Sequence, residues 1–225
     1  MPAIGYDGQA RIAAATVTVA GDDLTAEVLA RALGAAGVGV LRLVRRDALA
    51  PAVTTALAES NPDLRVEARS WPSGPGWVAA LEGSTLVVRS GFDDDAMLRA
   101  AIRLGLPAVV VRADDIQVDM VSFRRQGPCP HLALDLPEVQ AAPTDGGPAA
   151  VVAAHLAAAE ALLLLAEGSE RSELVEGEPG ARRPGLARAK HLRLPLDGGP
   201  PRTNDIPWTP ECFACGGSGT EMTFA

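Results

Sequence analysis

Two short stretches of the chain combine residue types that can do chemistry. The first is near the C-terminus, where Cys212 and Cys215 are separated by two residues, and Cys129 is the third cysteine of the 225-residue chain. An odd cysteine count and a C-x-x-C spacing favour metal or redox chemistry over a structural disulfide. Redox chemistry is the weaker alternative, because Gly216 and Gly217 follow and no helix begins there to stabilise a thiolate.

The second stretch is the loop Gly21-Asp22-Asp23, between a β-branched run at 15–20 and a helical pattern at 24–36. A glycine-rich loop in this position lets backbone N–H groups bind phosphate. Here a single glycine precedes two carboxylates, which repel a polyanion and can instead cap the helix. The loop therefore predicts a poor site for a triphosphate.

The remaining candidate residues favour structural roles. The histidines cannot be tied to a nucleophile, so no Ser-His-Asp or Cys-His arrangement is indicated. His155 falls in an apolar helical pattern and is expected to be a core or interface histidine. Trp71 and Trp77 flank a Pro/Gly-rich loop and are expected to anchor it, with an exposed binding lip as the alternative.

Alternating strands and helices are expected to position these residues. The βαβ pattern predicts a parallel sheet with right-handed crossovers, extended by an antiparallel strand at 116–123 near the sheet edge. We predict an N-terminal extension at 1–14, one α/β domain at 15–215 with a flexible loop at 167–190, and a disordered tail at 216–225. The predicted strands are 15–20, 38–44, 64–68, 84–88, 108–111 and 191–196, and the helices are 24–36, 52–59, 77–81, 93–104 and 150–166.

Composition narrows the function classes. The net charge is −8 and no basic stripe is present, which argues against nucleic acid as a partner. The N-terminus has no charged-then-apolar signal pattern, so a cytoplasmic protein is expected. The longest apolar stretch, 149–166, is interrupted by His155 and Glu160, and its length and polarity argue against a membrane span.

Several motifs, in their order along the chain, resemble those of the ThiF/E1 superfamily of activating enzymes. The segments 29–39 and 41–44 (LARALGAAGVG, LRLV) resemble its "LA-x-x-GVG-x-L-x-LVD" motif, and Asn61-Pro62 its "NP". The segments 86–88 and 105–111 resemble "DLVV … G-x-P-x-V", and 151–165 its late "A-x-x-A-L-x-L-L" helix. The chain is most similar to the ThiF-like domain of proteins that serve azole-forming cyclodehydratases in peptide pathways.

This resemblance implies a Rossmann-like, three-layer α/β fold and an ATP-dependent adenylyltransferase that activates a carboxylate or amide. Carried over to this sequence, the nucleotide site would include Gly21, Asp47 near the ribose, and Asp94 for magnesium. The chain departs from the family at Arg45, which replaces the ribose-binding acid, and at the degraded glycine loop. ATP and magnesium are therefore not expected to bind in the family manner.

The resemblance also implies a structural zinc site that would staple the C-terminal tail to the sheet. Gly127-Pro-Cys129 resembles the family's "GPC-x-x-C", and Trp208 to Cys215 resembles its "W-x-x-H-P-x-C-x-C" ending. With His131 in place of the missing thiolate, the ligand set would be Cys129, His131, Cys212 and Cys215. A free thiol pair on the tail is the alternative.

Three functions follow as hypotheses. The first is a noncatalytic ThiF/E1-like scaffold or partner subunit that is linked to peptide modification and a peptide substrate. It would associate through its Ala-rich helices, either as a homodimer or with a related catalytic subunit. The second is a working adenylyltransferase. The third is a ligand sensor in which Arg45 and Arg46 meet a phosphate or carboxylate.

Overall fold

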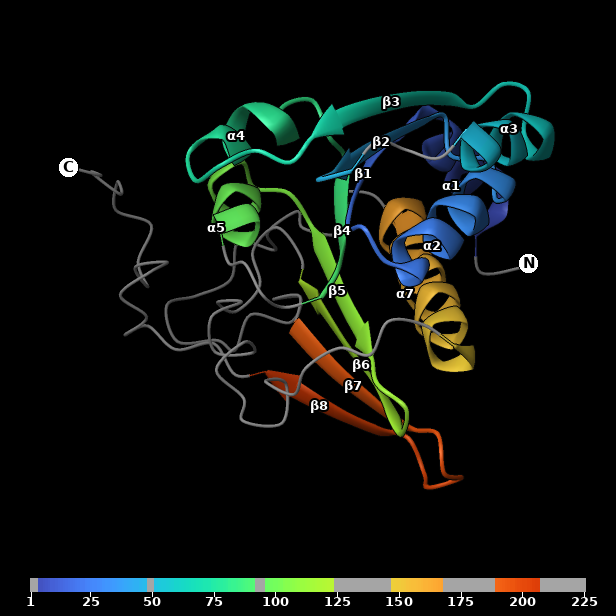
Figure 1. The fold of residues 1–225 in the computed structure, drawn as a ribbon, viewed down its shortest axis with the longest axis vertical. Coiled ribbons are helices and arrows are strands. Elements are labelled where there is room, and N and C mark those ends of the chain that lie inside the picture. Colours follow the sequence, from blue (N-terminus) through green and yellow to red (C-terminus); the bar gives the residue numbers. More distant parts are fainter. Residues whose placement is uncertain (1–3, 48–50, 92–95, 124–146, 168–188, 207–225) are drawn as a thin grey trace, which may run out of the picture.

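A single eight-stranded sheet forms the centre of the molecule, a computed structural model that describes residues 4–47, 51–91, 96–123, 147–167 and 189–206 (Figure 1). Its first five strands are parallel and its last three antiparallel. The predicted mostly parallel sheet with an antiparallel extension is thus confirmed. From one edge to the other the strands are β3 (Arg65–Ser70), β2 (Val40–Arg45), β1 (Thr16–Ala20), β4 (Leu86–Ser90), β5 (Ala108–Ala113), β6 (Gln117–Phe123), β7 (Ala189–Pro195) and β8 (Arg202–Ile206).

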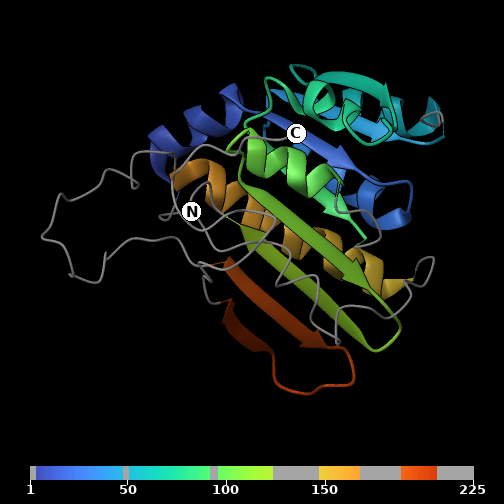
Figure 2. The same ribbon diagram turned by 90° about the vertical axis from the view of Figure 1, so that its left-hand side faces the viewer.

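Helices cover both faces of the sheet and make three layers. Figure 2 shows α5 in front of the strands and α7 behind them. One apolar core lies between the sheet and α1, α2, α3 and α7, and a second lies between the sheet and α4 and α5. The helices are α1 (Gly5–Ala14), α2 (Leu24–Ala35), α3 (Pro51–Ser60), α4 (Gly76–Leu81), α5 (Ala96–Arg103) and α7 (Pro148–Glu167).

The βαβ unit at the start of the sheet follows from its sequence. Thr16–Ala20 is β-branched at four of its five positions, and the strand is buried apart from half-buried Thr16. Leu24–Ala35 then buries Leu29 and Leu33 against the sheet. Gly37 follows with a φ of +92°, the left-handed conformation that ends a helix and favours glycine.

Helix α7 is the most apolar helix described, and its alanines make it a core element. Ala153, Ala154, Ala157 and Ala161 are fully buried, so the helix lies close to the sheet. With 20 residues and a mean hydropathy of 2.0, it is long and apolar enough to cross a membrane on those criteria alone, contrary to the sequence-based expectation. Since 56% of its most apolar stretch is buried inside the molecule, it has the burial of a core helix.

The edges and ends of the sheet contain features that were not expected from the sequence. Strand β6 is antiparallel as predicted but lies inside the sheet, because β7 and β8 continue beyond it. Strand β8 was not predicted, since Arg202–Ile206 is polar and follows a Gly/Pro-rich turn. The segment expected as an N-terminal extension contains α1, in which Arg11 Nη1 donates to the carbonyl of Ala166 at 2.9 Å. The flexible loop at 167–190 and the tail at 216–225 lie almost entirely outside the described residues.

Candidate functional site

The candidate site lies at the carboxyl ends of β1, β2 and β4. Strand β1 lies between β2 and β4, and the connections from β1 to β2 and from β3 to β4 run to opposite sides of it. Ligands of open α/β sheets bind at such a switch point. The loop that leaves β1 at Gly21, and the end of β4 at Ser90, border this position.

The packing around residue 21 leaves no room for a side chain, so only glycine fits there. A Cβ atom added to Gly21 would collide with the hydroxyl of Ser90 and come within 2.9 Å of the Ala26 methyl group. The Gly21 N–H donates to the carbonyl of Val44 at 3.2 Å, which keeps the loop on β2. The one glycine left in this loop therefore serves close approach between β1, β4 and α2.

Asp23 caps helix α2. Its backbone is extended (φ −89°, ψ 174°), and its Oδ1 accepts a hydrogen bond from the N–H of Ala26 at 2.9 Å. This is the geometry of an N-cap residue, and it uses one of the free amide groups at the helix start. The predicted capping by one of the two aspartates is confirmed.

Asp22 reaches across to the end of β2. Its Oδ1 accepts hydrogen bonds from the N–H groups of Arg46, at 2.8 Å, and Asp47, at 3.5 Å. The guanidinium of Arg46 lies 3.6 Å from Oδ2, and Nε of Arg45 lies 3.5 Å from Oδ1. The two aspartates were expected to repel a polyanion; in the structure the negative charge of Asp22 is balanced by Arg45 and Arg46.

Arg45 closes the loop from the other side. Its Nη2 donates to the carbonyl of Asp22 at 3.0 Å, and its Nη1 donates to Glu27 on α2 at 3.3 Å. In the family resemblance this position carries a ribose-binding acid. Here it carries a mostly buried cation that holds the β1–α2 loop against α2.

Two hollows of very different volume lie at this end of the sheet. Between the β1–α2 loop, α2 and α3 there is only about 10 Å³, which is room for about one water molecule. A larger hollow of about 240 Å³ opens beside the ends of β2 and β3. It is lined by Leu43 and Ala68, by Arg45, Arg46 and Arg69, and by Asp47 and Ser70.

The predicted cofactor residues are only partly brought together. Gly21 and Asp47 lie at the same end of the sheet, since Asp47 donates its N–H to the residue after Gly21. Asp94 lies outside the described residues, as do all four predicted zinc ligands, Cys129, His131, Cys212 and Cys215. Within the described ranges, no three metal-binding side chains form a group.

The two tryptophans pack against each other, as expected of residues that anchor a loop, whereas His155 lies at the surface. Trp77 is fully buried and meets the ring of Trp71 edge to face, with centroids 5.0 Å apart, so the pair is no exposed binding lip. The guanidinium of Arg46 lies 4.2 Å from the centre of the Trp71 ring. His155, expected to be a core or interface histidine, is not in the core: it is exposed, with Nδ1 2.8 Å from the carbonyl oxygen of Val151.

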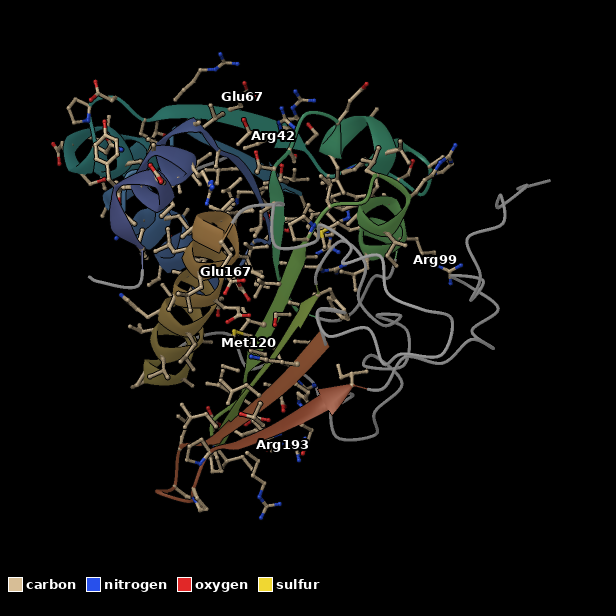
Figure 3. The ribbon with its side chains drawn as sticks, turned by 180° about the vertical axis from the view of Figure 1, so that it is seen from behind. Arg42, Glu67, Arg99, Met120, Glu167 and Arg193 are labelled. Carbon is tan, nitrogen blue, oxygen red and sulfur yellow. The ribbon has the colours of Figure 1, made fainter. Side chains whose placement is uncertain are left out.

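Arg42 on β2 organises the opposite face of the sheet. Figure 3 shows it beside Glu67 of β3, and its Nε donates to Glu67 at 3.1 Å. Its Nη1 also donates to the carbonyl of Glu82, just after α4, at 2.9 Å. Hydrogen bonds from Arg65 and then Arg42 hold the pKa of Glu67 below its usual value. This cluster fixes α4, and with it Trp77, against the sheet.

A second buried charge cluster lies in the antiparallel part of the sheet and was missed from the sequence. Asp119 on β6 is fully buried and accepts hydrogen bonds from His191 at 3.0 Å, Arg193 at 3.1 Å and Arg112 at 3.2 Å. Figure 3 shows Arg193 on β7, far along the sheet from Arg42. The sequence signal was an aspartate placed between the apolar residues Val118 and Met120 of a predicted strand.

Comparison with known proteins shows the fold. No family model and no curated protein matches the sequence. The crystal structure of E. coli MccB with ATP is similar to 93% of this chain and is covered over 69% of its own length, with a TM-score of 0.71 and 14% sequence identity. The crystal structure of E. coli MccB with MccA-N7isoAsn is also similar to 93% of this chain and is covered over 70% of its length, with a TM-score of 0.69 and 14% identity. PaaA is similar to 89% of this chain, with a TM-score of 0.66, 13% identity and 67% of PaaA covered. The resemblance to ThiF/E1-like proteins is therefore confirmed at the level of the fold.

Proposed function

We propose that this chain is a noncatalytic ThiF/E1-like protein that acts as a scaffold or partner subunit in peptide modification. The main support for the proposal is that side chains of the β1–α2 loop bind backbone amide groups of the chain itself, at the position where a phosphate would bind in an activating enzyme. Asp23 binds an amide at the start of α2, and Asp22 ties the loop to the residues after β2. A nucleotide phosphate bound in the usual position, on the amide groups at the start of α2, would have to displace this cap.

The charge arrangement supports the same proposal. Catalysis of phosphoryl chemistry needs cations aimed at the oxygens on which negative charge develops. Arg45, the cation nearest the loop, is engaged by Asp22 and by Glu27 instead. A ThiF-like protein with this loop is better suited to keeping an interface than to activating a carboxylate.

The link to peptides rests on the comparisons. MccB is described as the microcin C7 biosynthetic enzyme and has been crystallised with forms of MccA. We infer a peptide-modifying context, a cytoplasmic location, and a partner that is a second copy or a related catalytic subunit. Nucleic acid and membranes are not proposed partners. The structure weakens one argument for association, because the alanines of α7 are largely used inside the molecule, where α7 packs on α2 and the sheet.

ATP–pyrophosphate exchange tests the proposal. The full chain, alone and with candidate peptides, is expected to show no exchange above a heat-denatured control. A ThiF/E1-like adenylyltransferase assayed under the same conditions serves as the positive control. Exchange that depends on the folded chain would overturn the noncatalytic assignment.

An ATP-dependent adenylyltransferase is the second candidate, favoured by the similarity to MccB with ATP and by the 240 Å³ hollow beside β2 and β3. In this alternative a second subunit supplies the missing cations. The two functions separate when the chain is assayed with such a subunit. Loss of exchange on replacing Asp47, which borders the hollow, by alanine would favour the enzyme, and unchanged exchange would place the chemistry in the partner.

A further inference from the structure

Four groups from the end of β2, two amides and two cations, converge on the carboxylate of Asp22. They are the successive backbone N–H groups of Arg46 and Asp47, at 2.8 and 3.5 Å, and the guanidinium groups of Arg45 and Arg46, at 3.5 and 3.6 Å. Successive amides and guanidinium groups directed at one anion make up the chemistry of an oxyanion-binding site. Asp22 thus fills a site that is built from another segment of the chain.

Asp22 leaves two polar atoms at this site without a hydrogen bond. Its Oδ2 is buried and accepts no hydrogen bond, and the Nε of Arg45 is buried and donates none. Buried polar groups in proteins are normally satisfied, so each exception needs a reason. An oxyanion with more oxygens, or one less constrained by the backbone, could satisfy both groups.

The site has room beside it for the body of a ligand. The hollow of about 240 Å³ is bordered by Arg45, Arg46 and Asp47, the same residues that meet Asp22, and also by Arg69 and Ser70 of β3. Its floor is apolar, formed by Leu43 and Ala68. Small-molecule sites typically combine an apolar floor with a few polar groups that fix orientation.

We propose that the end of β2 is a binding site for an oxyanion, a carboxylate or a phosphate monoester, and that Asp22 is its tethered internal substitute. In the structure described here the internal anion occupies the site and holds the β1–α2 loop closed. A ligand oxyanion whose body fills the adjacent hollow displaces Asp22 and releases the loop. This site is separate from the amides at the start of α2, and it does not depend on whether the chain activates ATP.

Titration calorimetry with inorganic phosphate and with acetate tests the proposal on the full chain. Asp22→Ala is compared with the wild type and with Asp63→Ala, an exposed aspartate whose removal changes the net charge equally. Removing a tethered competitor at millimolar effective concentration is expected to tighten binding of at least one probe by about tenfold. Adding Arg45→Gln to Asp22→Ala is expected to abolish this gain, since it removes one of the converging cations.

Asp22→Asn, which keeps the size of the side chain, gives the same test if the alanine variant does not fold. A gain for phosphate alone identifies a phosphate site, a gain for acetate alone identifies a carboxylate site, and a gain for both identifies a general oxyanion site. Equal binding by the Asp22 and Asp63 variants would overturn the proposal. Pyrophosphate exchange by the wild type would overturn the proposed function and leave this inference standing, so the two failures are distinguishable.

Discussion

Asp119 accepts hydrogen bonds from β5 and β7, through Arg112, His191 and Arg193. Burial alone would raise the pKa of this carboxyl. The hydrogen bonds from His191, Arg193 and Arg112 outweigh the burial and place the pKa below its usual 3.8. Because the pKa of Asp119 is lower in the folded than in the unfolded chain, the ionised carboxylate stabilises the fold. This stabilisation is fully present above about pH 4 and decreases as the pH falls below that value.

Replacing Asp119 by asparagine is expected to lower the free energy of unfolding by about 3 kcal/mol or more, because it removes a fully buried carboxylate that pairs with Arg112, His191 and Arg193. Urea denaturation at pH 7 measures this difference. Asp115→Asn, at an exposed position, is the matched control and should change the stability by less than about 0.5 kcal/mol.

The same pair of variants tests the sign of the pH dependence. The stability gap between the wild type and Asp119→Asn should be constant from pH 7 to pH 5 and should narrow below the usual pKa of 3.8. A gap that widened on acidification would contradict the assignment of Asp119 as the ionised centre of the cluster.

Local chemistry at this scale was predictable, whereas contacts between distant residues were not. The cap by Asp23 follows from its place before a helical pattern and involves a residue three positions away. The bond between Asp22 and Arg46 spans 24 residues, and the one between Asp119 and His191 spans 72. Both hydrogen bonds depend on the order and register of the strands in the folded sheet, and the local sequence around either residue does not specify this order or register.

At the scale of elements, helix α7 is fitted to the sheet through small side chains. Ala154→Leu places three more carbon atoms at a fully buried position, and overpacking of this kind costs about 1–3 kcal/mol. Ala159→Leu makes the same change on the exposed side of the same helix and should alter stability by no more than about 0.5 kcal/mol. Equal effects in urea denaturation would contradict the observed orientation of α7.

Most elements with a clear period or an apolar run were predicted. The strands and helices of the parallel half lie within a few residues of their predicted positions because β-branched runs alternate with helical spacing. Helix α1 and strand β8 were missed, since Gly5–Ala14 has a weak apolar pattern and β8 is polar on an outer edge. Polar edge strands are common in natural sheets and give little periodic signal.

At the scale of the whole molecule, the predicted zinc site would link the tail to the rest of the chain. The reduced, purified protein is expected to hold one zinc ion per chain by elemental analysis, and Cys215→Ser is expected to lose it. His155→Gln is the control, because this exposed histidine lies outside the predicted ligand set. A wild-type chain that holds no zinc after purification without chelators would contradict the ligand set.

The fold of the whole molecule is that of ThiF/E1-like proteins, but the fold alone does not fix the activity. Our proposal that the chain is a noncatalytic relative of the activating enzymes rests on a few residues after β1 and β2. There, the side chains of Asp22, Asp23 and Arg45 bind one another's segments and the start of α2. We propose that these contacts prevent a nucleotide from binding at the start of α2.

Thermal and urea denaturation of the full chain with and without Mg-ATP tests that claim most directly. A nucleotide that binds only the folded chain would add about 2.7 kcal/mol to the free energy of unfolding at one hundred times its dissociation constant. We predict no stabilisation at millimolar Mg-ATP beyond that given by the same ionic strength of magnesium chloride. A saturable stabilisation that is specific for the nucleotide would contradict the account.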